Sequence, residues 1–132
     1  MKGIDTNVLI RYLVSDDKKQ AEQANTAIQA AADEGEALML CSVVLVEAVW
    51  VLQGVYRLSK AATLVLLDKV FATAQFEIEE RDTARQALED FRATNADFAD
   101  CLIGRKNRRL GCDKTFTFDQ DLRKLDTFEA LS

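Results

Sequence analysis

The sequence of 132 residues contains no histidine and no proline, and it has only three cysteines. Without histidine the chain has no Ser-His-Asp triad, no histidine-based ribonuclease mechanism and no His-ligated zinc site. Cys41, Cys101 and Cys112 form no C-x-x-C pair, and their odd number fits a reducing compartment better than a disulfide framework. Acid, base or metal chemistry therefore falls to carboxylates, and 17 basic against 22 acidic residues leave a net charge of -5.

Long hydrophobic runs are absent as well. The longest apolar tract, residues 43–52, is interrupted by Glu47 and is far shorter than the ~20 residues that a membrane span needs. Lys2 and Asp5 lie too close together to leave an apolar signal region between them. We therefore expect no membrane association and a cytoplasmic location. The length and a hydrophobic fraction of 48% predict a single domain over residues 1–132.

Helices and short strands alternate along the predicted chain. Polar residues before periodic apolar stretches predict helices after Ser15, Ser42, Ser59, and Thr94 or Asn95. Extended segments are predicted at residues 2–4, 38–41, 76–78 and 114–118, and a weaker one at 128–131. The alternation predicts an α/β protein, a three-layer α/β/α sandwich with a mostly parallel sheet of 4–5 short strands.

Acidic residues follow the predicted strands, and ligands of open parallel sheets bind beyond the carboxyl ends of the strands. Asp5 ends the first predicted strand and Asp119 the fourth, while Ser42 ends the second and Glu47 lies little more than one turn into the next helix. Asp100 lies one turn into its own helix. A simpler interpretation stays open for Asp5 and Asp119, because an aspartate before a helix is a common N-cap.

Glu47 is four residues from Val43 and three from Trp50, and Val46 precedes it directly, which predicts that it lies in the apolar stripe of its helix. Burying an unpaired carboxylate costs several kcal/mol, so a buried Glu47 is paired, neutral or bound to a cation. The structural alternative is an ion pair with Arg105 or Lys106.

Asp97 and Asp100 are three residues apart and share a helix face. Capping explains Asp97, so Asp100 is the preferred functional carboxylate and Asp97 an auxiliary. If Asp5, Glu47, Asp100 and Asp119 converge, their repulsion requires neutralisation by protons or cations. Mg²⁺ or Mn²⁺ fits an all-carboxylate site, acidifies a bound water and screens charge on a phosphodiester, so no histidine is needed.

Basic residues concentrate in one segment, which has a net charge of +4 within ten residues although the whole chain is acidic. Its members are Arg105, Lys106, Arg108, Arg109 and Lys114, opposed by Asp113. Such a run predicts phosphate contacts with RNA. The alternative is a solvated helix end stabilised by the helix dipole. Trp50 is predicted to serve core or dimer packing, and the acids within residues 77–80 and 89–90 to lie on solvated faces.

Four segments together resemble a known family: MKGIDTNVLIRY, VVLVEAVWVL with Glu47, ADFADCLIG with Asp100, and GCDKTFTFD with Asp119. In this order they resemble the PIN-domain ribonucleases, and more narrowly the VapC-type toxins of VapBC toxin-antitoxin pairs. The resemblance covers essentially the whole chain. Two departures are Gly104, where alanine is usual, and the lack of a proline at the start of the Glu47 helix.

The resemblance implies that Asp5, Glu47, Asp100 and Asp119 bind Mg²⁺ or Mn²⁺. It also implies supporting residues, with Thr6, Asn7, Ser42 and Thr117 hydrogen-bonding the carboxylates or the substrate phosphate, and Asp97 or Asp121 as auxiliary acids. The expected activity is endonucleolytic cleavage of transfer or ribosomal RNA that leaves a 5′ phosphate and a 3′ hydroxyl. The expected partners are a second copy in a homodimer and a VapB-type antitoxin that obstructs the site.

Two other functions are weighed against this one. Haloacid-dehalogenase-like phosphotransferases also end their first strand in an aspartate nucleophile, but Asn7 stands where that family places a second aspartate. A catalytically inactive PIN-like RNA-binding module is disfavoured because all four acids are retained.

Overall fold

The computed structural model describes residues 1–131, and the chain divides into two compact units at Glu79 and Glu80. We call Met1–Glu79 unit 1 and the part that starts at Glu80 unit 2, and each is described by itself. All strand pairs are parallel, and helices connect the strands within unit 1. The predicted α/β class with short parallel strands is therefore confirmed.

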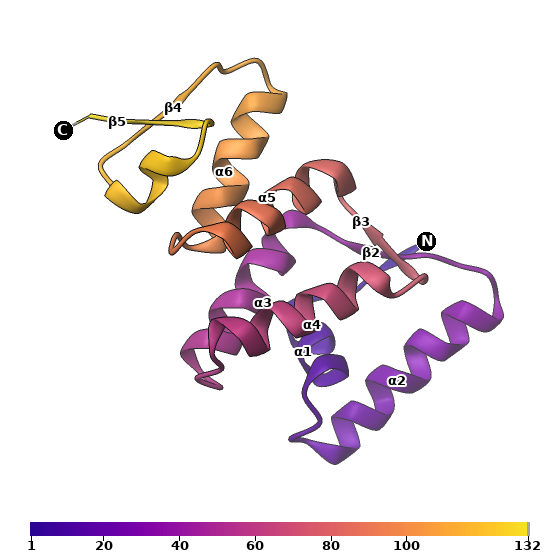
Figure 1. The fold of residues 1–132 in the computed structure, drawn as a ribbon. Coiled ribbons are helices and arrows are strands. Elements are labelled where there is room, and N and C mark those ends of the chain that lie inside the picture. Colours follow the sequence, from indigo (N-terminus) through magenta and orange to yellow (C-terminus); the bar gives the residue numbers. More distant parts are fainter. Residues whose placement is uncertain (132) are drawn as a thin grey trace. The chain divides into compact units, whose positions relative to one another are not determined.

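Unit 1 contains a three-stranded sheet in the order β1-β2-β3. Its strands are β1 (Lys2–Gly3), β2 (Leu38–Leu40) and β3 (Phe76–Ile78). The register pairs Lys2 with Leu38 and Leu38 with Phe76. Helices α1 (Thr6–Leu13) and α2 (Lys18–Asp33) connect β1 to β2, and helices α3 (Ser42–Gly54) and α4 (Lys60–Ala72) connect β2 to β3 (Figure 1).

The periodic apolar residues of unit 1 form its core. In α2 the buried residues are Ala21, Ala24, Ile28 and Ala31, the face that the sequence predicts. Ser59 caps α4 by accepting a hydrogen bond from the Ala62 amide at 3.1 Å, also as predicted. The start of α2 differs from the prediction, because Asp17 rather than Ser15 caps it.

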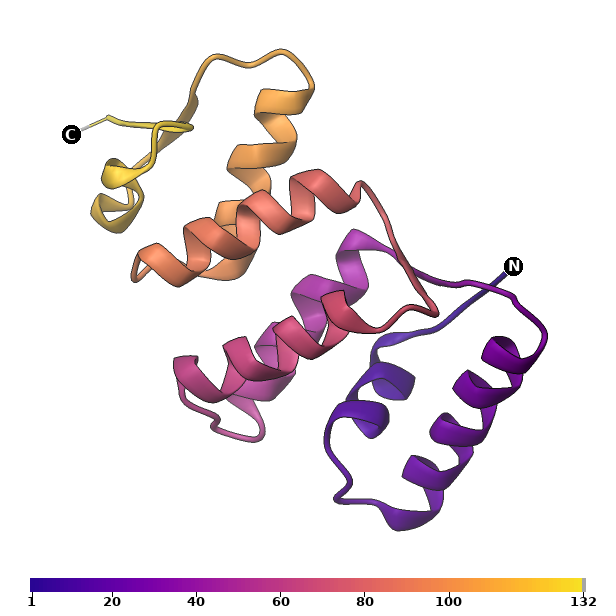
Figure 2. The ribbon, with the colours of Figure 1, turned by 45° about the vertical axis from the view of Figure 1, so that its right-hand side comes forward.

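Unit 2 pairs two helices and carries a small sheet beyond them. The helices are α5 (Arg81–Ala93) and α6 (Phe98–Arg109), which lie side by side in Figure 2. Strands β4 (Thr115–Thr117) and β5 (Phe128–Ala130) are joined by the 3-10 helix η1 (Gln120–Lys124). The rings of Phe91 and Phe98 meet edge to face at 5.8 Å and help to join α5 to α6.

The predicted start of α6 at Thr94 or Asn95 is wrong, because Thr94 belongs to the end of α5. The Thr94 hydroxyl donates to the Asp90 carbonyl oxygen at 2.8 Å, so the side chain satisfies a last-turn carbonyl of α5. Asp97 then occupies the N-cap position of α6. Helix α5 itself was not predicted from the sequence, although it buries Ala84, Ala87 and Leu88 at helical spacing.

A local steric restriction explains why position 104 holds glycine and not the alanine that is usual there. A Cβ atom at this position would overlap the Phe128 ring and lie 2.8 Å from Thr127 Oγ1. Gly104 therefore lets the start of β5 approach α6 more closely than alanine would allow. Among the described residues no helix is both long and apolar enough to cross a membrane.

Candidate functional site

In unit 1 two of the predicted acids lie at the amino end of α1. Asp5 follows β1 and caps α1, since its Oδ1 accepts a hydrogen bond from the Val8 amide at 3.0 Å. The next residue, Thr6, donates its hydroxyl to Glu47 Oε1 at 2.9 Å across 41 residues of sequence. The N-cap interpretation of Asp5 is confirmed, and it occupies only one of the two carboxylate oxygens.

The predicted burial of Glu47 is wrong, because its face of α3 is exposed. Val43 is 65% exposed and Trp50 is 54% exposed, so Trp50 is not a core residue. Helix α3 instead buries the opposite face. Nearly every position of this helix is apolar, so hydrophobic spacing did not distinguish the buried face from the exposed one.

The amino end of α3 is capped by an acid that the sequence analysis assigned to a solvated face. The Ser42 amide donates to Glu79 Oε1 at 2.8 Å, while the Ser42 hydroxyl is buried without a hydrogen-bond partner. The preceding Cys41 makes no side-chain cap. Glu79 directly follows β3, which is the signal that selected the other acids. Asn7 is exposed, and its side chain makes no hydrogen bond with the described residues.

In unit 2 three predicted acids interact electrostatically. Asp100 is half-buried in the first turn of α6, and burial raises the pKa of its carboxyl group, as do the negative charges of Asp97 and Asp119. Asp119 follows β4 and caps η1, since its Oδ1 accepts from the Asp121 amide at 2.9 Å. Its own amide donates to Thr117 Oγ1 at 3.0 Å, so Thr117 shapes the turn that carries Asp119.

The four principal acids have no basic partner. In the part of the chain that the structure describes, Asp5, Glu47, Asp100 and Asp119 make no ion pair with lysine or arginine. Carboxylate and hydroxyl oxygens are the ligands that Mg²⁺ and Mn²⁺ prefer, so this donor set fits such an ion. Within either unit, the described residues contain no group of three or more acids or cysteines arranged to hold an ion by themselves.

The basic segment of α6 is bound to acids of its own unit. Arg105 makes a two-point contact with Asp90, with Nε 2.6 Å and Nη2 2.9 Å from the two carboxylate oxygens. Lys106 and Arg109 both donate to Glu80 at 2.6 Å, and these two cations lower the pKa of the Glu80 carboxyl group. Arg105 and Lys106, the partners considered for Glu47, therefore each bind an acid of their own unit.

A second set of contacts joins α6 to the segment before β5. Arg108 donates to Asp126 Oδ2 at 3.0 Å, and Lys114 lies 3.2 Å from Asp126 Oδ1. Asp90 is only 8% exposed, so the prediction that it lies on a solvated face is wrong. The reason is that Arg105 lies on the facing helix and compensates the charge.

Comparison with known proteins identifies the family. Residues 3–127 match the PIN domain family, and the chain belongs to that family, as the four segments indicated. Among individual proteins, it is similar to a VapC ribonuclease of Aquifex aeolicus. The two are 24% identical over 125 residues, which cover 95% of this chain and 92% of the relative.

Proposed function

We propose that this PIN-domain protein is a Mg²⁺- or Mn²⁺-dependent endoribonuclease and the toxin of a type II toxin-antitoxin pair. The observation that carries the proposal is the Thr6 hydrogen bond to Glu47, which links the residue directly after Asp5 to an acid on α3. The VapC ribonuclease relative supports the same activity.

As the family resemblance implies, Asp5, Glu47, Asp100 and Asp119 are the residues that would hold the ion. The bound ion supplies Lewis-acid chemistry, lowering the pKa of a water molecule and screening charge on the phosphodiester. Thr6 fixes the orientation of the Glu47 carboxylate, and Thr117 fixes the turn of Asp119. Asp97 and Asp121 are auxiliary acids, and the exposed Asn7 hydrogen-bonds a carboxylate or the substrate phosphate. The Ser42 hydroxyl is buried and does not reach the substrate.

The proposed RNA contacts come from the basic segment of α6 and β4. Arg109 is 60% exposed and Lys114 is 41% exposed, so a phosphate can reach both side chains although each also binds an acid. Arg105 and Lys106 are each 27% exposed, so the first role of these two side chains is to hold α6 against acids of α5 and its N-cap. Arg108 does both, because it also binds Asp126.

The proposed partners follow the family and the relative. A VapB-type antitoxin covers the acidic site, and the chain acts on transfer or ribosomal RNA in the cytoplasm. The exposed face of α3, with Val43 and Trp50, is suited to contact a second copy in a homodimer.

The decisive experiment measures cleavage of cellular RNA by the purified protein and by Asp5→Asn. We expect cleavage with Mg²⁺ or Mn²⁺, none with a chelator, and none by the variant, with product ends carrying a 5′ phosphate. Asparagine keeps the N-cap of α1, so the fold is retained.

The melting temperature of the metal-free Asp5→Asn variant serves as a control for its fold. Replacing one acid relieves repulsion among the others, so metal-free Asp5→Asn should melt at or above the temperature of metal-free wild type. A marked loss of stability would assign Asp5 a structural role, and RNA cleavage unaffected by the substitution would point to a contaminating nuclease. Phosphate release from small phosphoesters through an Asp5 adduct would instead favour a phosphotransferase.

A further inference from the structure

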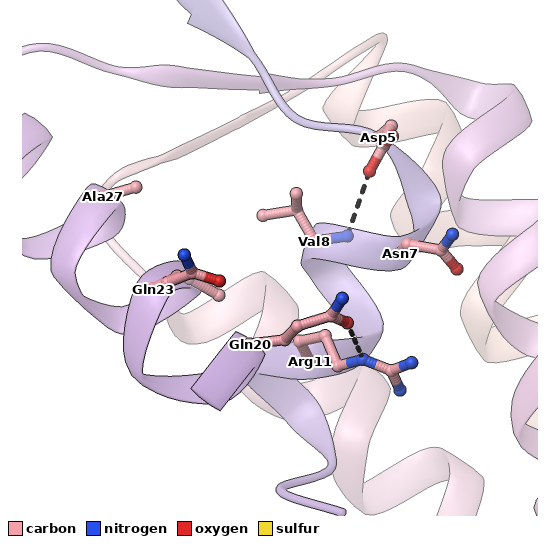
Figure 3. A pocket seen from close by; sticks show the side chains of 8 residues that line it. Asp5, Asn7, Val8, Arg11, Gln20, Gln23 and Ala27 are labelled. Atoms are coloured by element: carbon pink, nitrogen blue, oxygen red, sulfur yellow. Dashed lines mark hydrogen bonds between the residues drawn. The ribbon is translucent and has the colours of Figure 1, made fainter. Parts of the chain in front are cut away.

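A cavity of about 300 Å³ in unit 1 shares Asp5 and Asn7 with the site described above and extends beyond it along α2. It lies between α1 and α2, and its lining includes Asp5, Val8, Arg11, Gln20, Gln23 and Ala27 (Figure 3). Its volume is at the lower end of the range for small-ligand sites, which suits one planar ring system with its substituents.

Arg11 lines one end of this cavity, and hydrogen bonds hold its side chain in a fixed orientation. Arg11 donates its Nε to Gln20 Oε1 at 2.6 Å, and its Nη1 donates to Tyr56 Oη at 2.9 Å. Nη1 also lies 3.2 Å from Asp16 Oδ1, so the charge of Arg11 is balanced locally. The Gln20 side-chain oxygen accepts the hydrogen bond from Arg11, so its NH₂ group remains available to donate hydrogen bonds to a ligand.

The amides of Asn7 and Gln23 also line this cavity, and that of Gln23 has both donor and acceptor unused among the described residues. The Gln23 side chain makes no hydrogen bond with the described residues, and in Figure 3 it extends from α2 on the side facing Val8. Val8, Ala24 and Ala27 supply apolar walls beside it. Apolar walls and a few amide groups match a nucleobase, which has flat apolar faces and a hydrogen-bonding edge.

We propose that this cavity binds one unpaired nucleobase of the RNA substrate, next to the phosphodiester that is cut, and that Gln23 and Gln20 read its edge. The proposal rests on the proposed ribonuclease function, because Asp5 lies both in the ion site and in the cavity lining. The free donor and acceptor of Gln23 match the edge of adenine, which presents N7 as an acceptor and N6 as a donor.

The test uses a pool of short RNA strands randomised around a single cleavage site, cut by the full chain with Mg²⁺ or Mn²⁺ and sequenced at the new 5′ ends. Wild type should prefer one base, adenine, at one position beside the cut. Gln23→Ala should reduce that preference roughly tenfold, as expected for the loss of a two-point base contact, with cleavage of the remaining sequences retained. Gln20→Ala should reduce it less, because Gln20 offers donors only.

The matched control is Gln29→Ala, a glutamine of the same helix that bonds Asp33 and lies outside the cavity. Its cleavage pattern should equal that of wild type, and all variants should show wild-type melting curves. Binding of the same strands without turnover, in the presence of a chelator, gives a second measure of base preference.

The outcomes separate the two proposals. A wild type that cuts RNA with the same pattern as Gln23→Ala would overturn the base site and leave the ribonuclease proposal standing. A wild type that binds RNA with base preference but never cuts would overturn the ribonuclease and retain the base site. Weaker binding of a cognate antitoxin peptide by Gln23→Ala, with an unchanged RNA pattern, would reassign the cavity to a protein partner and so refute the proposal.

Discussion

The proposed functional acids of unit 1 and the paired acids of unit 2 differ in the groups that they meet. In unit 1 Asp5 and Glu47 meet only neutral groups, a backbone amide and a hydroxyl. In unit 2 Asp90, Glu80 and Asp126 are each bound by arginine or lysine. A carboxylate without a cation partner retains its negative charge for an added cation, whereas one bound by arginine is already neutralised.

The same distinction divides unit 2 internally. Among residues 80–131, Asp100 and Asp119 have no basic partner and interact with other acids, although five basic residues lie between positions 105 and 114. The basic residues are instead paired with acids at the N-cap and last turns of α5 and before β5. Partner type therefore distinguishes Asp100 and Asp119 from the acids that bind the basic residues of this unit.

The largest expected effect is the loss of RNA cleavage when Glu47, an acid without a basic partner among the described residues, is replaced. Glu47→Gln removes a proposed ion ligand while leaving an oxygen for Thr6, so RNA cleavage should fall by at least about 100-fold. Its melting temperature should stay near that of wild type, because Glu47 is exposed. Cleavage rates and thermal melting measure both properties, and an active Glu47→Gln would exclude Glu47 from the site.

The matched change in unit 2 is Asp90→Asn, which leaves the Arg105 charge without its partner. We expect a loss of about 2–3 kcal/mol in the free energy of unfolding. This is less than for a fully buried pair, because Arg105 is 27% exposed. Denaturant unfolding measures the loss, and unchanged stability would contradict the structural role of the pair.

A smaller loss is expected for Gly104→Ala, which tests the packing of β5 on α6. The added Cβ collides with the Phe128 ring and Thr127, so the variant should be destabilised by about 1–2 kcal/mol. The double variant Gly104→Ala with Phe128→Leu should recover part of this loss, and denaturant unfolding of both would show whether the ring is the obstacle.

The smallest expected effect concerns the pH dependence of stability. Lys106 and Arg109 lower the pKa of Glu80, so this group contributes stability above the ordinary glutamate pKa of 4.5 and loses it as the pH falls through the lowered value. Melting temperatures of Glu80→Gln should therefore fall less between about pH 5 and pH 3 than those of wild type. Equal slopes would show that the two cations contribute nothing through Glu80.

Much of the fold was predictable because local rules decide it. The buried face of α2 and the cap at Ser59 follow from apolar spacing and from the hydrogen-bonding needs of a helix end. The wrong helix starts at Ser15 and Thr94 arose where several polar residues compete for one cap. Asp17 and Asp97 occupy those positions, and short-range sequence does not rank the candidates.

The partners of charged residues were much less predictable. Nothing near Asp90 in the sequence indicates Arg105, 15 residues away on the next helix. Likewise, the prediction that Glu47 is buried was wrong because α3 is apolar on nearly every face. Only the contacts of the helix identify its buried face.

The amino-acid sequence by itself determined the α/β class, the absence of histidine chemistry and the set of acids that follow the strands, because these depend on residue type and local spacing. Tertiary structure alone decided which acids meet a hydroxyl and which meet a guanidinium, and it placed a cavity beside Asp5. The physical reason is that the charge state of a carboxylate depends on the groups within a few ångströms of it, and chain folding brings those groups from distant positions.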